Sequence, residues 1–377
     1  MFSIHVDTAR TWRGGQNQVL LTVNGLNAIG HRAALVAHPN GELRNRAAEG
    51  LELIPIASRT EMDLSAAWRL ARVVKRLQPD VVHAHDAHAT AMASFALSLG
   101  GPGTSSPALV VSRRVDFHLR NNSFSRWKHR QVDCFLAASE AIRSMLVADG
   151  VPTERTLTVH EGIDVEHVLA APLVNVHEAF FLPHGAPVVG NVAALVPHKG
   201  QRHLIEAAHL VVQEVPDARF VILGEGELRE HLERQVREYH LEKHVLLPGF
   251  RTDVLGCMKA FDLFVMSSVT EGLGTSILDA MACSRAIVAT EAGGIPEIVQ
   301  DDVTGVLVAP RDHKAMAREI VRLLGDGPLR ARMGERGRAR VFERFTVERM
   351  VAETAAAYER VAGRPHAADI ARLSAAD

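Results

Sequence analysis

The sequence predicts an α/β protein with two doubly wound, Rossmann-like domains that face each other across a cleft. Short apolar segments alternate with amphipathic segments of helical periodicity along the chain, which is typical of parallel sheets with helices on both faces. The length of 377 residues suggests two domains, and the hydrophobic content of 47% is enough for two buried cores. Ligands of such sheets bind at the carboxyl ends of the strands, so the loops there are the candidate functional segments.

Short apolar segments in both halves of the chain are predicted to be strands. In the first half they are Phe2–Val6, Ala33–Ala37, Leu51–Ile56, Val81–Ala84, Leu109–Ser112, Phe135–Ala138 and Leu157–Val159. In the second half they are Val188–Val192, Phe220–Leu223, Val245–Leu247, Leu263–Met266, Ala286–Thr290 and Gly305–Val308. The helix after the first strand keeps Val19 and Val23 on one face and ends at Gly30.

The two domains are placed at residues 1–168 and 184–346. The segment Pro172–Pro187 between them is rich in proline and weakly patterned, which is typical of a linker. We expect it to act as part of a hinge on which the domains close around a ligand. The chain from about His313 onward is predicted to be helical, and the residues from Gly363 on are expected to fray.

The composition excludes several classes of protein. The net charge of −2 and the pI near 6.9 argue against a general nucleic-acid binder. Three isolated cysteines, Cys134, Cys257 and Cys283, without a C-x-x-C pair, indicate reduced thiols and a cytoplasmic protein. The sequence enters its first strand directly, so no signal peptide is expected, and no apolar run approaches the ~18 residues of a membrane span.

A bound metal is not indicated by the residue pattern. The 20 histidines include no H-E-x-x-H pair, and the chain has no D-x-D pair that could hold a metal on a diphosphate. We therefore predict no metal ion.

The segment from Glu271 to Asp279 is the most informative motif. Glu271 follows the strand Leu263–Met266, and Asp279 lies one to two turns into the next helix. The N–H groups of Leu273 to Ser276 would point at a ligand over the helix start, forming an anion site with an acid on each side. A nucleotide sugar, which is a diphosphate with a polyhydroxy ring at each end, has this shape. Simple helix capping by the two acids is the alternative interpretation.

Two further loops suggest phosphate binding. Gly14 and Gly15 precede a helix after the first strand, where paired glycines let the backbone approach a phosphate, although a plain turn would use the same residues. Lys199 lies at a helix start, where the helix dipole disfavours a cation. A bound phosphate would remove that conflict, which favours a ligand-binding lysine over a solvated one.

Two glycine loops carry weaker signals. Gly224 and Gly226 follow a strand, but the full G-x-G-x-x-G fingerprint is absent, which counts against a nicotinamide or flavin enzyme. The loop from Gly293 to Glu297 is interpreted equally well as a helix start or as a ligand contact.

The ordered set of motifs resembles glycosyltransferase family 4, the retaining, nucleotide-sugar-dependent enzymes with the GT-B fold. The resemblance covers nearly the whole chain, and the set is specific although each motif alone is weak. The motifs that carry it are Gly14-Gly15, His83-Ala-His85, Gly162-Ile-Asp164, Lys199-Gly200, Gly224-Glu-Gly226, Glu271 with Asp279, and Gly293-Gly294-Ile-Pro-Glu297. It also implies a C-terminal helix, at about 347–377, that crosses back onto the first domain.

The resemblance implies a hexosyltransferase that uses a UDP- or GDP-sugar as co-substrate and no other cofactor. Lys199 would neutralise the donor diphosphate, Glu271 would bind sugar hydroxyls, and Asp279 would bind the ribose. The other residues implied on the donor side are Gly14, Gly15, Gly224, Gly226, Phe250, Arg251, Gly272, Leu273, Gly274 and Thr275.

Two positions depart from the family pattern. Asp279 replaces a glutamate and is one methylene shorter, so its ribose contact could be water-mediated. Ala194 stands where the family often has an arginine, so a second cation on the diphosphate would have to come from elsewhere, and Arg13, Arg251 and Arg202 are the candidates. A sugar-nucleotide epimerase or hydrolase, and a catalytically silent nucleotide-sugar-binding protein, therefore stay open as alternatives.

The acceptor side is marked by a locally basic segment. Arg113 and Arg114 follow a strand and are predicted to face the acceptor, and His85 and His118 are candidate catalytic residues that would bind a donor hydroxyl or orient the acceptor. The basic, aromatic stretch Arg126–Arg130 suggests peripheral contact with the anionic inner face of a membrane, or a solvated helix face. The acceptor is an unidentified hydroxyl compound (a cell-envelope glycan, a lipid or a small molecule), and the sequence does not indicate an oligomeric state.

Overall fold

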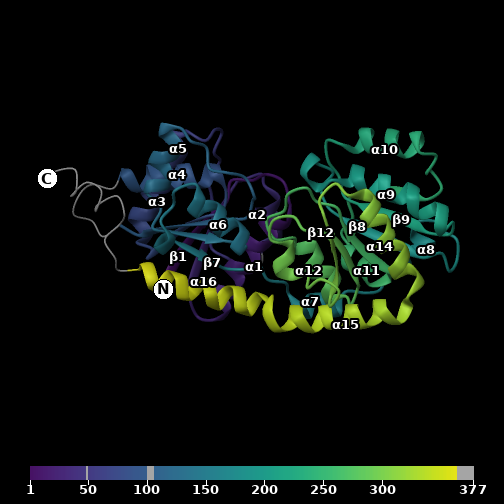
Figure 1. The fold of residues 1–377 in the computed structure, drawn as a ribbon. Coiled ribbons are helices and arrows are strands. Elements are labelled where there is room, and N and C mark those ends of the chain that lie inside the picture. The colour runs from purple at the N-terminus through teal and green to yellow at the C-terminus, as the bar shows by residue number, and fades with distance from the viewer. Residues whose placement is uncertain (48–49, 100–105, 363–377) are drawn as a thin grey trace. The chain divides into compact units, whose positions relative to one another are not determined.

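The computed structural model describes residues 1–47, 50–99 and 106–362, and the chain divides into two compact units (Figure 1). Unit 1 comprises Met1–Gly162 together with the chain from Val347 onward, and unit 2 comprises Ile163–Thr346. Each unit contains one parallel β-sheet. The predicted fold class, two doubly wound α/β domains, is confirmed.

Unit 1 holds a seven-stranded sheet in the order β3-β2-β1-β4-β5-β6-β7. Its strands are β1 (Phe2–Val6), β2 (Arg32–Ala37), β3 (Leu53–Pro55), β4 (Val81–Ala84), β5 (Ala108–Arg113), β6 (Cys134–Ala137) and β7 (Thr156–Thr158). Its helices are α1 (Gly14–Ala28), α2 (Glu42–Arg46), α3 (Leu64–Leu77), α4 (Ala87–Ser98), α5 (Ser123–Arg130), α6 (Glu140–Ala148), the 3-10 turn η1 (Thr153–Arg155) and α16 (Val347–Val361). The strand order reverses between β1 and β4, which is where ligands of doubly wound sheets bind.

Unit 2 repeats this order with six strands, β10-β9-β8-β11-β12-β13. Its strands are β8 (Val188–Val192), β9 (Arg219–Leu223), β10 (Val245–Gly249), β11 (Leu263–Met266), β12 (Ile287–Thr290) and β13 (Gly305–Val308). Its helices are α7 (Val165–Ala170), α8 (Val176–Ala179), the 3-10 turn η2 (Pro197–Lys199), α9 (Gln201–Glu214), α10 (Arg229–Glu238), α11 (Val254–Ala260), α12 (Thr275–Ala282), α13 (Ile295–Ile298), α14 (His313–Gly325) and α15 (Gly327–Arg344). Here the order reverses between β8 and β11.

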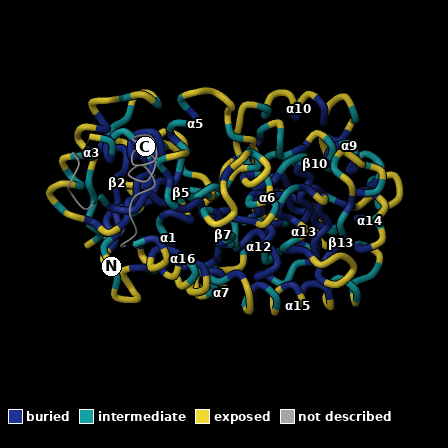
Figure 2. Tube along the Cα trace, turned by 60° about the vertical axis from the view of Figure 1, so that its left-hand side comes forward, coloured by how far each residue is buried: buried dark blue, intermediate teal, exposed yellow. Residues whose placement is uncertain are grey.

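Every predicted strand occurs, with ends that differ by at most two residues. The central strands are found because both faces of a parallel sheet are covered, so their sequences are apolar without alternation. All four residues of β4 and all four of β11 are buried. Figure 2 shows the buried segments in dark blue in the interior of each unit.

The proline-rich segment does not form a separate linker between the units. The chain passes from unit 1 to unit 2 at Gly162–Ile163, and the following segment, with α7 and α8, belongs to unit 2. The Val174 N–H donates to the Gly256 carbonyl at 3.2 Å, and a Cβ on Gly256 would lie 2.3 Å from the Pro172 carbonyl oxygen. The prolines therefore shape a segment packed on α11, and the predicted boundaries at 168 and 184 lie inside unit 2.

The C-terminal helix α16 is part of unit 1, where it packs on α1. A Cβ on Gly25 of α1 would lie 2.4 Å from a methyl carbon of Val351, so the two helices approach closely at this glycine. The predicted frayed end, from Gly363 on, lies outside the described residues. Among the helices that the structure describes, none is long and apolar enough to cross a bilayer.

Candidate functional site

Lys199 and Glu271 form an ion pair at the switch point of unit 2. Lys199 ends the turn η2 after β8, and Glu271 lies in the loop after β11. The Lys199 Nζ lies 2.6 Å from Glu271 Oε2, and the side chains of Lys199 and Glu271 are only 19% and 9% exposed. The Ser268 hydroxyl donates to the same carboxylate oxygen at 2.8 Å. The structure thus brings together the two residues that the sequence put forward as the centre of the site.

The backbones of the two loops hold this pair in place. The Val269 N–H donates to the His198 carbonyl at 2.7 Å, and the Ser267 hydroxyl donates to the Lys199 carbonyl at 3.0 Å. Gly200 has φ +64°, and a Cβ there would lie only 2.2 Å from the Ser267 carbonyl oxygen. Glycine follows the lysine because the loops touch at this point and because its backbone is left-handed.

The start of α12 offers free backbone donors beside Glu271. The helix begins after Gly274, which has φ +101°, and no side chain caps it. The first backbone bond of this turn runs from the Ile277 N–H to the Gly274 carbonyl, so the N–H groups of Thr275 and Ser276 precede the intrahelical bonds. An anion placed there would be stabilised by these groups and by the helix dipole.

Asp279 lies one turn further along α12 and is partly buried. Burial raises the pKa of Asp279 to about 7. Among the described residues its carboxylate has no hydrogen-bond or ion-pair partner. It is the second acid predicted for the site.

The other predicted donor-side loops are shaped by packing. A Cβ on Gly224 would lie 2.0 Å from the Ala193 carbonyl oxygen, and one on Gly226 would lie 2.3 Å from that of Leu195. These glycines let the loop after β9 cross the loop after β8 closely. In the sequence these two glycines were a weak indication of ligand binding, and the close approach of the two backbones explains why glycine occurs at both positions.

Two of the three cations considered as a substitute at Ala194, Arg251 and Arg202, have acidic partners within unit 2. Arg251 binds Asp253 through two nitrogens at 2.5 and 2.7 Å, and Arg202 lies 3.6 Å from Glu206. Phe250, beside Arg251, is exposed. Arg13 belongs to unit 1, precedes α1 and is exposed.

At the switch point of unit 1, two acids lie at the carboxyl ends of β1 and β4. Asp7 is buried, and its carboxylate accepts from the Ala9 N–H at 2.9 Å and from the Gln16 amide at 3.2 Å. Burial, followed by the negative charge of Asp86, raises the pKa of Asp7 to about 6. Asp86 caps α4 and accepts from the Thr8 N–H at 2.7 Å. Asp7 was not predicted as a site residue, although an acid directly after a strand at the switch point indicates a possible ligand-binding position.

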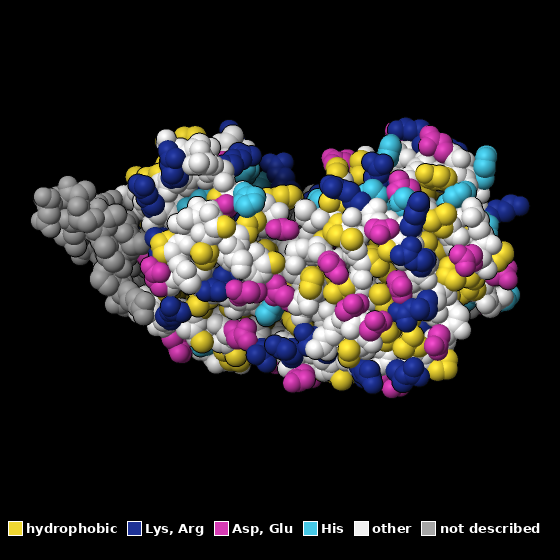
Figure 3. Space-filling view, viewed as in Figure 1, with side chains coloured by type: hydrophobic (Ala, Val, Ile, Leu, Met, Phe, Trp, Pro, Cys, Tyr) yellow, Lys and Arg dark blue, Asp and Glu magenta, His cyan; other side chains and the backbone are white. Residues whose placement is uncertain are grey.

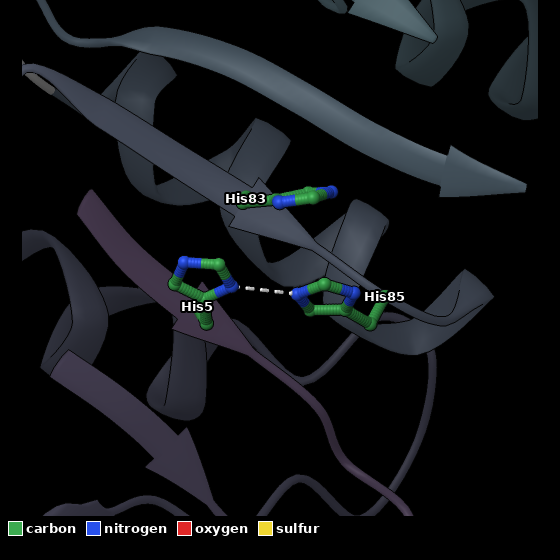
Figure 4. A group of neighbouring side chains, drawn as sticks. All are labelled: His5, His83 and His85. Atoms are coloured by element: carbon green, nitrogen blue, oxygen red, sulfur yellow. Dashed lines mark hydrogen bonds between the residues drawn. The ribbon is translucent and has the colours of Figure 1, made fainter. Parts of the chain in front are cut away.

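Three buried histidines form a cluster behind this edge (Figure 4). His5 and His83 are register partners on β1 and β4, and His85 follows β4. His5 Nδ1 lies 2.9 Å from His85 Nε2, and the Arg114 guanidinium donates to His85 Nδ1 at 3.0 Å. His83 Nδ1 lies 2.6 Å from the Tyr358 hydroxyl of α16.

Arg114 fixes the tautomers of this cluster because a guanidinium can only donate. His85 Nδ1 must accept, so His85 Nε2 carries the proton and donates to His5 Nδ1. His5 then donates from Nε2 to the Ser3 hydroxyl at 3.1 Å or to the Tyr358 hydroxyl at 3.4 Å. Burial, followed by the charge of Arg114, lowers the pKa of His5 to about 3, and burial also lowers the pKa values of His83 and His85 well below the usual value. The rings are therefore neutral.

The ligand atoms of the three histidines all lie within 4.8 Å of one another, which is close enough to hold a metal ion. Two observations favour a hydrogen-bonded cluster instead. Each ring nitrogen already has a partner, and the remaining one, His83 Nε2, lies 2.8 Å from the Ser112 hydroxyl. The ring centroids of His83 and His85 lie 4.1 Å apart with the ring planes tilted by 36°, whereas ligands of one ion point their nitrogens at a common centre.

The structure separates the other predicted acceptor-side residues. Arg114 forms an ion pair with Glu161 at 3.0 Å and lies beside Gly15, whose added Cβ would be 3.9 Å from its Cδ. Arg113, at the end of β5, instead donates to the Phe117 carbonyl. His118 pairs with Asp149 at 2.6 Å and is largely exposed, so it is not hydrogen-bonded to the histidine cluster.

Comparison with known proteins matches both units. The family model described as Glycosyltransferase Family 4 matches residues 12–167, and the model described as Glycosyl transferases group 1 matches residues 175–340. The N-acetyl-alpha-D-glucosaminyl L-malate synthase of Bacillus anthracis is 26% identical over 296 residues, which is 77% of each chain. A putative glycosyltransferase of Bacillus subtilis, EpsD, is 28% identical over 314 residues and covers 78% of this chain and 80% of its own.

Solved structures show the same fold. The Anabaena protein HepE in complex with UDP and glucose superposes with a TM-score of 0.83 at 20% identity, covering 96% of this chain and all of its own. The sucrose-phosphate synthase of Thermosynechococcus elongatus superposes with a TM-score of 0.79 at 18% identity, covering 96% of this chain and 98% of its own. These structures show the GT-B fold, and the two family models, matching residues 12–167 and 175–340, show that the chain belongs to the family 4 glycosyltransferases and is an enzyme of that class.

Proposed function

We propose that this protein is a retaining, metal-independent glycosyltransferase that moves a sugar from a UDP- or GDP-sugar to a hydroxyl acceptor. The observation that carries the proposal is the Lys199–Glu271 pair beside the uncapped start of α12. It combines a cation, free N–H donors and a carboxylate at the switch point of one sheet. The structural neighbour HepE, in complexes with UDP, glucose and UDP-glucose, supports a nucleotide sugar as the donor.

Donor binding in this proposal exchanges the partner of Lys199. The ammonium group leaves Glu271 for the diphosphate, and the N–H groups of Thr275 and Ser276 bind the same anion. The freed Glu271 carboxylate then accepts hydrogen bonds from hydroxyls of the donor sugar and keeps its hydrogen bond from the Ser268 hydroxyl. In this proposal Asp279, whose pKa is raised by burial, binds the ribose hydroxyls.

The transfer step needs no protein nucleophile. The acceptor oxygen forms a bond with the anomeric carbon, while the bond from that carbon to the diphosphate oxygen breaks and leaves its electron pair on the diphosphate. The acceptor proton passes to a diphosphate oxygen on the same face of the sugar, so the configuration is retained. Lys199 and the α12 start stabilise the departing negative charge, which is the largest contribution that a site of this kind can make.

The acceptor side is assigned to the carboxyl edge of the unit 1 sheet. Asp7, His85 and Arg114 lie there, and Arg114 is held in one orientation by His85 and Glu161. An oriented guanidinium next to a buried carboxyl group is suited to positioning a hydroxyl compound by hydrogen bonds.

A second function, silent binding of a nucleotide sugar, is favoured by one observation. Ala194 removes a cation of the family pattern, and Arg202 and Arg251 already have acidic partners. A single charged hydrogen bond to a diphosphate is worth about 1.5–3 kcal/mol, so its loss could leave binding without turnover.

One experiment separates these functions. The protein is incubated with UDP- and GDP-sugars, with EDTA or magnesium, and with a panel of sugar, polyol and lipid-linked hydroxyl acceptors, and the products are followed by proton NMR. A transferase gives a glycoside with the donor's anomeric configuration in EDTA. Release of free sugar without an acceptor would indicate a hydrolase, and an altered donor sugar would indicate an epimerase. A donor that binds but stays unchanged would indicate a silent binding protein. Loss of turnover in EDTA would contradict metal independence.

A further inference from the structure

Helix α3 carries a second apolar cluster on its solvent side. Its buried side, Ala66, Ala67 and Leu70, packs on α4 as in any surface helix. On the other side Leu64 is 62% and Trp68 is 54% exposed, and Met62, just before the helix, is 61% exposed. Three large apolar side chains that stay mostly in water, two on the helix and one just before it, are unusual for a solvated face.

A row of cations continues this cluster along the helix. Leu64, Trp68, Arg72 and Arg76 are spaced by four residues and so share one stripe. Lys75 adds a third cation, and the Arg72 guanidinium lies over the Trp68 ring at 4.9 Å. Among the described residues none of these three cations has an acidic partner.

The acids next to this face are already occupied. Asp63 caps α3 and accepts from the N–H groups of Ala66 and Arg59. Glu61 binds Lys128 of α5 at 2.5 Å. We call the face formed by Met62, Leu64, Trp68, Arg72, Lys75 and Arg76 the α3 face. It presents exposed apolar side chains next to three cations that have no acidic partner among the described residues.

This combination selects among possible partners. A chain of net charge −2 is not a general nucleic-acid binder, and Figure 3 shows acidic and basic side chains mixed over the face that is viewed. A tryptophan and a leucine at one end of a helix, followed by cations along it, match the boundary between acyl chains and anionic headgroups. We propose that the α3 face docks unit 1 on the surface of an anionic lipid bilayer, with Leu64 and Trp68 inserted at the headgroup level.

The proposal moves membrane contact away from the segment that the sequence suggested. In α5, Lys128 is buried and paired. The rings of Phe124 and Trp127 contact the Phe95 ring of α4, with centroids 5.8 and 4.7 Å away. Only Arg126 and Arg130 of that basic stretch remain exposed. The aromatic residues of α5 are therefore part of the packing within unit 1, whereas Trp68 is available.

The test is flotation of the full chain with two kinds of vesicle, one of phosphatidylcholine alone and one with roughly 30 mol% phosphatidylglycerol. We expect binding to the anionic vesicles only, weakened about tenfold or more in about 0.5 M salt. Leu64→Ser with Trp68→Ser, and separately Arg72→Gln with Lys75→Gln and Arg76→Gln, should each lower the affinity about tenfold or more. The Trp68 emission should shift to the blue on binding, and Trp68→Phe should remove that shift.

Matched control variants lie in unit 2. Arg234→Gln with Arg237→Gln removes two exposed cations from α10, and Phe181→Ser removes an apolar side chain that is 95% exposed. Both should bind vesicles like the natural chain, and circular dichroism should show that all variants are folded. Equal binding to both vesicles, no binding by the natural chain, or equal binding by the α3 variants would overturn the proposal. Binding to soluble polyglutamate but not to vesicles would indicate an acidic protein partner instead.

Discussion

Replacing Glu271 by glutamine should change the binding of a nucleotide and of its sugar derivative in opposite directions. In the proposed function, a diphosphate displaces Glu271 from Lys199; the two side chains are 2.6 Å apart and are 19% (Lys199) and 9% (Glu271) exposed. A charged hydrogen bond of this kind is worth about 1.5–3 kcal/mol, and about 1.4 kcal/mol corresponds to a factor of ten in affinity. Glu271→Gln leaves Lys199 free, so UDP or GDP should bind about tenfold more tightly.

The sugar derivative should not share this gain. Glu271→Gln also removes the carboxylate that, in the proposed function, accepts hydrogen bonds from the sugar hydroxyls, so the additional affinity that the sugar provides should fall by about tenfold or more. Isothermal titration with UDP, GDP and their sugar derivatives measures both affinities. Glu319→Gln is the matched control because Glu319 pairs with Arg322 at the same 2.6 Å distance, but on side chains that are 26% and 42% exposed. Equal weakening of nucleotide and nucleotide sugar by Glu271→Gln would refute the exchange of partners.

Three further predictions concern single side chains. Because burial raises the pKa of Asp279 to about 7, the folded chain binds a proton more tightly than the unfolded chain, so the free energy of unfolding should fall as pH rises from about 4 to 7. Asp279→Asn should remove this fall, which is on the order of 1–3 kcal/mol. The same pH dependence of the free energy of urea unfolding in both chains would contradict the prediction. Gly200→Ala should lower the free energy of chemical unfolding by about 2 kcal/mol or more. The control Gly30→Ala should lower it clearly less, because Gly30 also has a positive φ but has open space around it. Equal effects would mean that the Ser267 carbonyl is no obstacle. Tyr358→Phe should cost about 1–3 kcal/mol and alter the nitrogen NMR signals of His83, while Tyr239→Phe should leave them unchanged; an unchanged His83 spectrum in Tyr358→Phe would rule out the hydrogen bond.

The fold was predictable because strands of a covered parallel sheet leave a strong local signal. Val188–Val192 and Leu263–Met266 occur with the predicted bounds. The linker prediction differed for a tertiary reason, since proline-rich composition does not show that Pro172 and Val174 pack on α11. The local sequence pattern indicates that a segment is irregular, but it does not show which part of the protein the segment packs against.

The candidate site was predictable where a residue type conflicts with its local position. Lys199 at a helix start carried that signal, whereas Glu271 was indicated by its place after a strand and before a glycine turn; the structure pairs the two side chains. The histidine cluster could not be foreseen from local patterns because it depends on register, which sets His5 beside His83, and on Tyr358, distant in sequence. Arg113 is the last residue of β5 and Arg114 follows the strand, and their side chains have different partners.

The most direct test of the account is thermal unfolding of the natural chain and of Lys199→Met with UDP-, GDP- and ADP-sugars and NADH, each in EDTA and in magnesium. At a ligand concentration of about 100 times its dissociation constant, binding should add about 2.7 kcal/mol of stability. The account predicts stabilisation by a UDP- or GDP-sugar that does not depend on metal, is lost in Lys199→Met and is kept in the control Lys243→Met, which changes an exposed lysine of the same unit. The same stabilisation in Lys199→Met, or none with any nucleotide sugar, would contradict it.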